Sequence, residues 1–252
     1  MADYSFHTPE PVVLEVKIPA GEIEIETVDG DESSVVLEGP DKLIEQTRVE
    51  LVGNRLKVEL ETRGPFGITI SIGDWSFGRE PLVVRARVPH ASRADLMTAS
   101  ADINLRGRYA ALKVKSASGD VGVSGEIDGD AEIKTVSGDV RLGSVGGSLT
   151  VQGVSADVDA EFVGGDATVK SVSGDVRIAH AREGHVTVQS VSGDIEIGVA
   201  AGTNLDVDAG SVSGDLASEV PLGSDASTLG GGPTLVVRGK TVSGDFKVFR
   251  AA

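Results

Sequence analysis

The stretch Ser171-Val172-Ser173-Gly174-Asp175-Val176 is one copy of a motif that the chain contains eight times. Each copy has a small first residue, a small apolar residue, Ser, then Gly or Ala, then Asp and an apolar residue. The copies begin at Thr98, Ser116, Thr135, Gly153, Ser171, Ser190, Ser211 and Thr241. Their aspartates are separated by 18, 19, 18, 18, 19, 21 and 30 residues. A nearly fixed period of this size indicates structural repeats that stack on one another.

Within one period, apolar and polar residues alternate in two short runs. From Asp157, Val158 and Ala160 form the first run, the glycines at 164–165 suggest a turn, and Ala167 and Val169 form the second. Val172 comes three residues after Val169, so we interpret this point as a bend with Val172 facing inward. About five buried residues cannot offset the cost of ordering one repeat. Neighbouring repeats must therefore supply hydrogen bonds and shared apolar columns.

These patterns predict an all-β protein, a single-stranded parallel β-solenoid (β-helix) with 18–19 residues per coil. We expect about seven or eight coils over residues 94–252, wound right-handed as parallel crossovers usually are. Residues 1–93 show alternation without a clean period, and we interpret them as a β-rich section that caps the solenoid.

Local signals add detail at both ends. Residues 40–49 read as a helix capped by Asp41, and Gly53-Asn54 as the turn of a hairpin. Near the C-terminus, residues 217–234 read as an extruded loop. Phe246 and Phe249 are interpreted as a plug over the last coil.

Composition excludes several functions. The net charge is −16, which argues against nucleic-acid binding, and the chain contains no cysteine for disulfides or thiol chemistry. No apolar run is long enough for direct membrane insertion, and the polar start does not resemble a signal peptide. We therefore expect a cytoplasmic protein.

The Gly-Asp pair of the motif has a structural interpretation and a functional one. Glycine allows a positive φ at a corner, and Asp can accept a backbone hydrogen bond there. The glycines in question are Gly119, Gly138, Gly174, Gly193, Gly214 and Gly244. The alternative is a ladder that binds cations, made of Asp120, Asp139, Asp157, Asp175, Asp194 and Asp215. Calcium-binding β-rolls carry two such signals per turn and this chain mostly one, so we favour the turn and predict neither metal nor cofactor.

No set of residues stands out as catalytic. Asp157, Asp159 and Asp166 with Lys170 could imitate the site of a polysaccharide-cleaving β-helix enzyme. Aspartate recurs in almost every coil, however, and aromatic residues that would stack on sugars make up only 4% of the chain. We therefore expect a protein without enzymatic activity.

Two other pairs of residues are candidate contact sites. His180 and His185 lie in one coil and could bind a metal, but we favour the interpretation that they are exposed loop histidines. Trp75 and Phe77 could anchor a partner protein, or could pack the first section onto the solenoid.

The repeated Ser-Val-Ser-Gly-Asp-Val motif resembles the bacterial putative-adhesin family of β-strand-repeat proteins, which belongs with the toast-rack domains. The resemblance is strongest from Thr98 to Phe246 and extends to the stretch Val16-Lys17-Ile18-Pro19-Ala20-Gly21. It implies the solenoid fold and a connection with cell-envelope stress systems, and it supplies no catalytic residues.

We therefore expect a structural or interaction scaffold that presents a rigid face to a protein partner or to itself. The open ends of a solenoid favour self-association, and a weak homodimer is expected. The alternative is a protein that binds carbohydrate or an envelope polymer, or a lyase-like relative.

Overall fold

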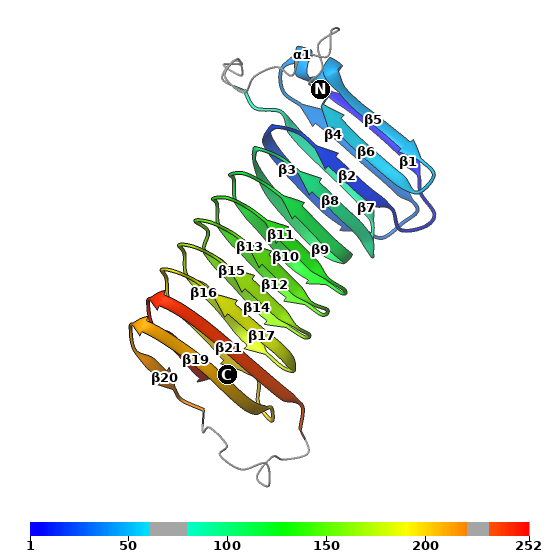
Figure 1. Ribbon diagram of the computed structural model, residues 1–252. Coiled ribbons are helices and arrows are strands. Elements are labelled where there is room, and N and C mark those ends of the chain that lie inside the picture. Colours follow the sequence, from blue (N-terminus) through cyan, green and yellow to red (C-terminus); the bar gives the residue numbers. More distant parts are fainter. Residues whose placement is uncertain (61–79, 221–231, 252) are drawn as a thin grey trace.

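The computed structural model describes residues 1–60, 80–220 and 232–251, and within them the chain forms twenty-two strands and one short helix. Figure 1 shows an elongated ladder of stacked coils with the N-terminal section at one end. The first section contains β1 (Ala2–His7), β2 (Val13–Lys17), β3 (Ala20–Val28), β4 (Glu32–Glu38), α1 (Asp41–Gln46), β5 (Thr47–Val52), β6 (Arg55–Leu60), β7 (Val83–Pro89) and β8 (Ser92–Met97).

The repeats contribute two strands per coil, one to each face of the solenoid. The long strand β9 (Ser100–Lys115) runs through both faces. The first face continues with β10 (Val121–Ile127), β12 (Val140–Val145), β14 (Val158–Val163), β16 (Val176–Ala181), β18 (Ile195–Val199), β22 (Phe246–Arg250) and β20 (Leu216–Ser218). The second face continues with β11 (Ala131–Lys134), β13 (Leu149–Gln152), β15 (Ala167–Lys170), β17 (Gly184–Gln189), β21 (Thr234–Ser243) and β19 (Asn204–Ser213).

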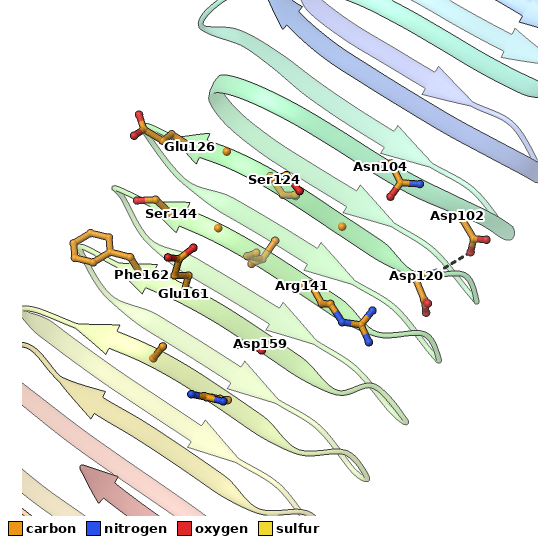
Figure 2. A pocket seen from close by; sticks show the side chains of 17 residues that line it. Asp102, Asn104, Asp120, Ser124, Glu126, Arg141, Ser144, Asp159, Glu161 and Phe162 are labelled. Atoms are coloured by element: carbon orange, nitrogen blue, oxygen red, sulfur yellow. Dashed lines mark hydrogen bonds between the residues drawn. The ribbon is translucent and has the colours of Figure 1, made fainter. Parts of the chain in front are cut away.

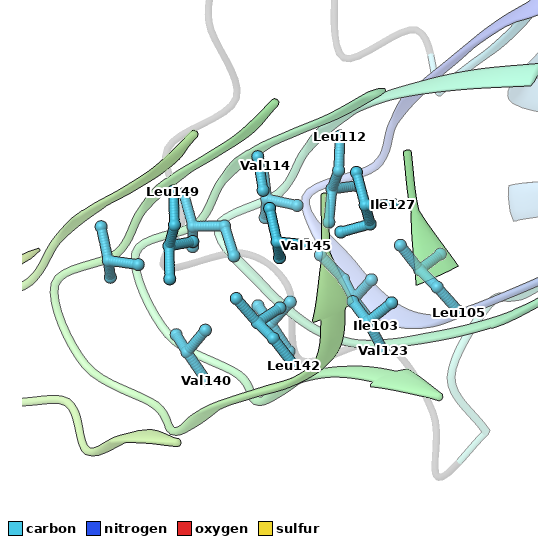
Figure 3. Close-up of a cluster of buried hydrophobic side chains, with 14 of the residues drawn as sticks. Ile103, Leu105, Leu112, Val114, Val123, Ile127, Val140, Leu142, Val145 and Leu149 are labelled. Atoms are coloured by element: carbon cyan, nitrogen blue, oxygen red, sulfur yellow. The ribbon is translucent and has the colours of Figure 1, made fainter. Parts of the chain in front are cut away.

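Neighbouring coils pair in parallel and in register, so equivalent residues form straight columns. Val140 pairs with Val158 and then with Val176, while Leu149 pairs with Ala167 and then with Val186. These columns face each other across a thin apolar layer, as Figure 3 shows for the coils around Leu142. The prediction of an all-β parallel solenoid is confirmed.

The coils do not stack in sequence order at the C-terminal end. β21 pairs with β17 on one side and with β19 on the other, so the last coil of the chain lies between the two that precede it. Phe246 is consequently buried in the apolar layer, and the expectation that it plugs the end is wrong. The outermost coil is residues 204–218, where Leu216 is 54% exposed. This coil has the poorer apolar columns, so it loses less by leaving one side uncovered.

The expected extruded loop is shorter than 217–234, because Leu216–Ser218 and Thr234–Ser243 are strands. Residues 221–231 lie outside the described part of the chain.

The first section extends the same columns and closes the other end. β3 and β2 pair in parallel with β9 and β8, while β1–β4, β4–β7 and β5–β6 are antiparallel. Helix α1 covers this end with Leu43 and Ile44, which are buried. It is shorter than predicted, because β5 begins at Thr47, and Asp41 is its first residue and not its cap.

Tyr109 lies where this section meets the solenoid. Its side chain is fully buried, and its hydroxyl donates to the backbone oxygens of Ile25 at 2.9 Å and Arg106 at 3.2 Å. Burial raises the pKa of the phenol well above its usual value. The Tyr109 hydroxyl therefore stays neutral, and its hydrogen bond to Ile25 links a coil of the repeats to a strand of the first section.

The valine of the repeated motif faces solvent, which corrects the prediction for Val172 and its equivalents. Val172 is 48% exposed, whereas Ser171 before it is buried. The strict alternation that begins at Val169 therefore continues as far as Val172 and breaks at Ser173, which is exposed. A serine can take the inward position because its hydroxyl finds a backbone partner within the corner.

Candidate functional site

In five of the eight copies of the motif, the first hydroxyl holds the corner of the coil. Ser171 Oγ donates to the carbonyl oxygen of Ser173 at 3.1 Å, which satisfies both groups inside the bend. The same bond is formed by Ser116 to Ser118, Thr135 to Ser137, Ser190 to Ser192 and Thr241 to Ser243. Ser and Thr are therefore equivalent at this position.

The glycine of the corner is required by close approach of the neighbouring coil. Gly174 has φ +132°, and a Cβ built on it would lie 2.2 Å from the carbonyl oxygen of Ala156. Two copies of the motif carry alanine instead, at Ala101 and Ala156. Both have negative φ and bury their methyl groups, so these two corners follow a different local path.

Backbone-to-carboxylate hydrogen bonds link the aspartates in two runs, interrupted between Asp139 and Asp157. Asp175 Oδ1 accepts the backbone N–H of Asp194 at 2.8 Å, and the N–H of Asp175 donates to Asp157 Oδ1 at 2.8 Å. The same bond joins Asp102 to Asp120, Asp120 to Asp139, Asp194 to Asp245 and Asp245 to Asp215. Figure 2 shows the bond between Asp102 and Asp120. Each carboxylate so engaged stabilises the next corner, which offsets repulsion between charges about 4.8 Å apart.

Among residues 1–60, 80–220 and 232–251, no three or more His, Cys, Asp or Glu side chains are arranged to hold a metal ion. The carboxylates of Asp157 and Asp175 instead accept backbone hydrogen bonds from the neighbouring coil.

A groove of about 1100 Å³ lies on the outer surface of the first face, across β10, β12 and β14. It exists because several outward positions carry no side chain or a small one, notably Gly122, Gly143, Ser124 and Ser144. Side chains at the margins surround this floor, with Phe162 at one end, as Figure 2 shows. The solenoid backbone makes the floor rigid, since each strand is bonded on both sides.

Negative charge dominates the groove. Five carboxylates line it, those of Asp102, Asp120, Glu126, Asp159 and Glu161, against the two guanidinium groups of Arg141 and Arg177. Both arginines are already engaged, Arg141 with Asp139 at 2.7 Å and Arg177 with Glu196 at 4.0 Å. The lining therefore suits a polar ligand that brings positive charge or hydroxyl groups.

The residues considered as a catalytic set do not converge. Asp159 points outward from β14 and lines the groove, whereas Lys170 lies on the second face. Asp166 sits at the opposite turn, where it accepts the backbone N–H of His185 at 2.8 Å. His180 belongs to β16 and His185 to β17, on different faces. Trp75 and Phe77 lie outside the described residues.

Sequence reasoning missed the groove itself. The available signal was glycine at outward strand positions, such as Gly122 and Gly143, where the alternation predicts an exposed side chain.

Parallel coils with an aspartate-edged corner define a repeat protein of the β-solenoid class. A family model described as Toastrack DUF4097 matches residues 12–249, and the chain belongs to this family.

Solved structures share the fold at low sequence identity. A putative adhesin from Bacteroides fragilis is 14% identical with a TM-score of 0.58, covering 98% of this chain and 96% of the other. A putative lipid binding protein from Parabacteroides distasonis is 15% identical with the same TM-score and coverage. No curated protein matches the chain. Within the described residues, no helix has the length and apolarity needed to cross a bilayer.

Proposed function

We propose that this protein is a non-enzymatic interaction scaffold, and that the groove on its first face receives an extended segment of a partner protein carrying Lys or Arg. The groove carries the proposal. It is long, shallow and rigid, and its lining has five carboxylates against two arginines that already have acidic neighbours. Such a surface attracts cationic segments and excludes acidic ones.

A binding role is also supported by the kind of groups that line the groove. Its hydroxyls belong to Ser124 and Ser144, and among the residues that the structure describes neither forms a hydrogen bond to a basic side chain that could activate it. The proposed setting is the bacterial envelope or its stress response. The toast-rack family and the adhesin and lipid-binding names of the structural neighbours support that setting.

A carbohydrate ligand is the second candidate, and Phe162 is the observation that favours it. An aromatic ring beside several carboxylates is a common arrangement for contacting the apolar and hydroxyl faces of a sugar. The same groove would then hold a neutral or amino-sugar polymer.

Fluorescence anisotropy with labelled probes separates these alternatives. The probes are an alternating Lys-Ser peptide, an alternating Glu-Ser peptide and a neutral oligosaccharide. We expect only the Lys-Ser peptide to bind. Glu161→Lys reverses one charge of the groove, and Ser124→Tyr fills the groove from an exposed position. We expect each of these variants to weaken binding of the Lys-Ser peptide by about tenfold.

The matched control is Asp208→Lys, which makes the same charge reversal at an exposed position of β19 on the second face. If this variant weakens binding as much as Glu161→Lys, the peptide responds only to the net charge of −16 and the groove is not the site. Binding of the oligosaccharide that Ser124→Tyr abolishes would replace the first proposal by the second.

A further inference from the structure

A row of exposed valines runs along the corner of five successive coils. Its members are Val136, Val154, Val172, Val191 and Val242, exposed by 52%, 44%, 48%, 48% and 47%. In the outermost coil the equivalent Val212 is 81% exposed, but the residue two before it is Gly210, so that coil is left out of the row. The serines that follow them form parallel bridges in the same order, from Ser137 through Ser155, Ser173 and Ser192 to Ser243. The row, here called the valine ridge, is therefore continuous, with one side chain about every 4.8 Å.

The corner does not need these side chains. Its bonds are formed by the backbone, as from Val172 N–H to Val154 O at 3.2 Å, and by the serine hydroxyls. Towards the first section the same position holds Ala99 and Ala117. A small residue therefore suffices for folding, and a contiguous row of exposed apolar side chains points to a contact.

The ridge has opposite chemistry on its two sides. Two residues before each valine, the second face presents a column of long cationic or amide side chains: Lys134, Gln152, Lys170, Gln189 and Lys240. Three residues after each valine comes an aspartate of the corner: Asp139, Asp157, Asp175, Asp194 and Asp245. Lys170 and Lys240 form no ion pair within the part of the chain that the structure describes.

We propose that the valine ridge is the dimer interface of this protein, with a second copy related by a two-fold axis parallel to the solenoid axis. Rotation about such an axis lays each valine against its own counterpart. It also exchanges the sides of the ridge, so the lysine column of one copy faces the aspartate column of the other. A two-fold axis across the solenoid would instead set lysine against lysine and aspartate against aspartate.

The contact is narrow. Five coils extend the ridge over roughly 19 Å, which is shorter than the interfaces of permanent dimers. The expected dimer is therefore weak and reversible. None of the five valines lines the groove on the first face, so the two proposals rest on different residues.

Single-cysteine variants test the arrangement, because the chain has no cysteine of its own. Under mild oxidation, Val136→Cys, Val172→Cys and Val242→Cys should each give a disulfide-linked dimer, since a parallel axis opposes every position to itself. Thr168→Cys is the control, half-buried on the outward side of the second face in the same coil as Val172. Cross-linking of Val172→Cys alone among the three would indicate the antiparallel arrangement and overturn the proposal. The proposal would also be overturned if the three valine-to-cysteine variants formed disulfide-linked dimers no faster than Thr168→Cys.

Sedimentation equilibrium of the full chain gives the energetic test. The double variant Val154→Ser, Val172→Ser and the single variant Lys170→Glu should each weaken dimerisation by about tenfold or more, with circular dichroism and melting unchanged. High salt should weaken the parent dimer as well. A parent protein that remains monomeric at all accessible concentrations, or a dimer indifferent to these changes, would refute the ridge as an interface. The second result would direct attention to the open end at β19 and β20.

Discussion

Gly239 and Phe246 share one space in the apolar layer of the coil that is inserted near the C-terminal end. A Cβ built on Gly239 would lie 1.9 Å from Cε2 of the Phe246 ring. In the adjacent coil the equivalent residues are Val188, which pairs with Gly239, and Ile195, which pairs with Phe246. The inserted coil thus replaces a valine and isoleucine combination by a glycine and phenylalanine combination that fills the same layer.

This complementarity predicts strong coupling between the two positions. Gly239→Val should overpack the layer and destabilise the fold by about 1–3 kcal/mol. Phe246→Ile leaves a cavity and should cost a similar amount. The double variant restores the combination of the adjacent coil, and we expect it to be more stable than either single variant. Urea unfolding of the four proteins measures this cycle. Additive losses would show that the two side chains do not share the space.

The stacking of coils could be predicted from the sequence, whereas their order could not. The alternation around Val158 and Val169 is local, and the period of the aspartates places equivalent residues in columns. Both C-terminal coils keep the motif, so either could be outermost by pattern alone. The deciding difference is energetic, since the coil with Phe246 and Val248 has more apolar surface to cover than the coil with Leu216 and Ser218.

The valine ridge and the groove escaped prediction for a related reason. The apolar character of Val172 favours an interior position, although the alternation from Val169 gives that position to Ser171. The bond from Ser171 to the Ser173 carbonyl lies within the corner and cannot be seen in a hydrophobicity pattern. The groove arises because Gly122 and Gly143 have no side chains. A pattern of apolar residues shows which positions are buried, but it does not show where glycines leave space on the surface.

The aspartate edge predicts a specific response to substitution at Asp175. Asp175→Ala removes the acceptor for the backbone N–H of Asp194 and should destabilise the fold by about 1 kcal/mol. Asp175→Asn retains a side-chain oxygen and should change stability by only a few tenths of a kcal/mol. Thermal unfolding with added calcium and with a chelator should give the same midpoint for the parent protein. A large rise with calcium would show that the edge also binds cations.

The corner glycines predict a position-dependent cost of adding a methyl group. Gly174→Ala should destabilise the fold by about 2–3 kcal/mol, because φ is +132° and the new Cβ would meet the carbonyl oxygen of Ala156. Gly210→Ala is the matched control in the outermost coil, where a Cβ meets nothing within 4 Å and φ is unrestrictive. Its stability should equal that of the parent within error. Equal losses at both positions, measured by urea unfolding, would remove close approach between coils as the cause.

The ion pairs of Glu132 predict how stability depends on pH. Lys113 Nζ lies 2.9 Å from Oε2 of Glu132, and Lys134 Nζ lies 2.9 Å from Oε1. Hydrogen bonds from Lys113 and, next in size of effect, from Lys134 lower the pKa of Glu132 from 4.5 to about 2. The folded-state pKa lies below the unfolded one, so the stabilisation is complete above 4.5 and is lost as the pH falls towards about 2. Glu132→Gln should therefore show a shallower loss of melting temperature over this range than the parent protein. Because the pair is exposed to solvent, high salt should reduce the difference. The difference in melting temperature between the two proteins could instead be as large at low pH as at neutral pH and unaffected by salt. That result would show that Glu132 stabilises the fold through packing of its side chain and not through its charge.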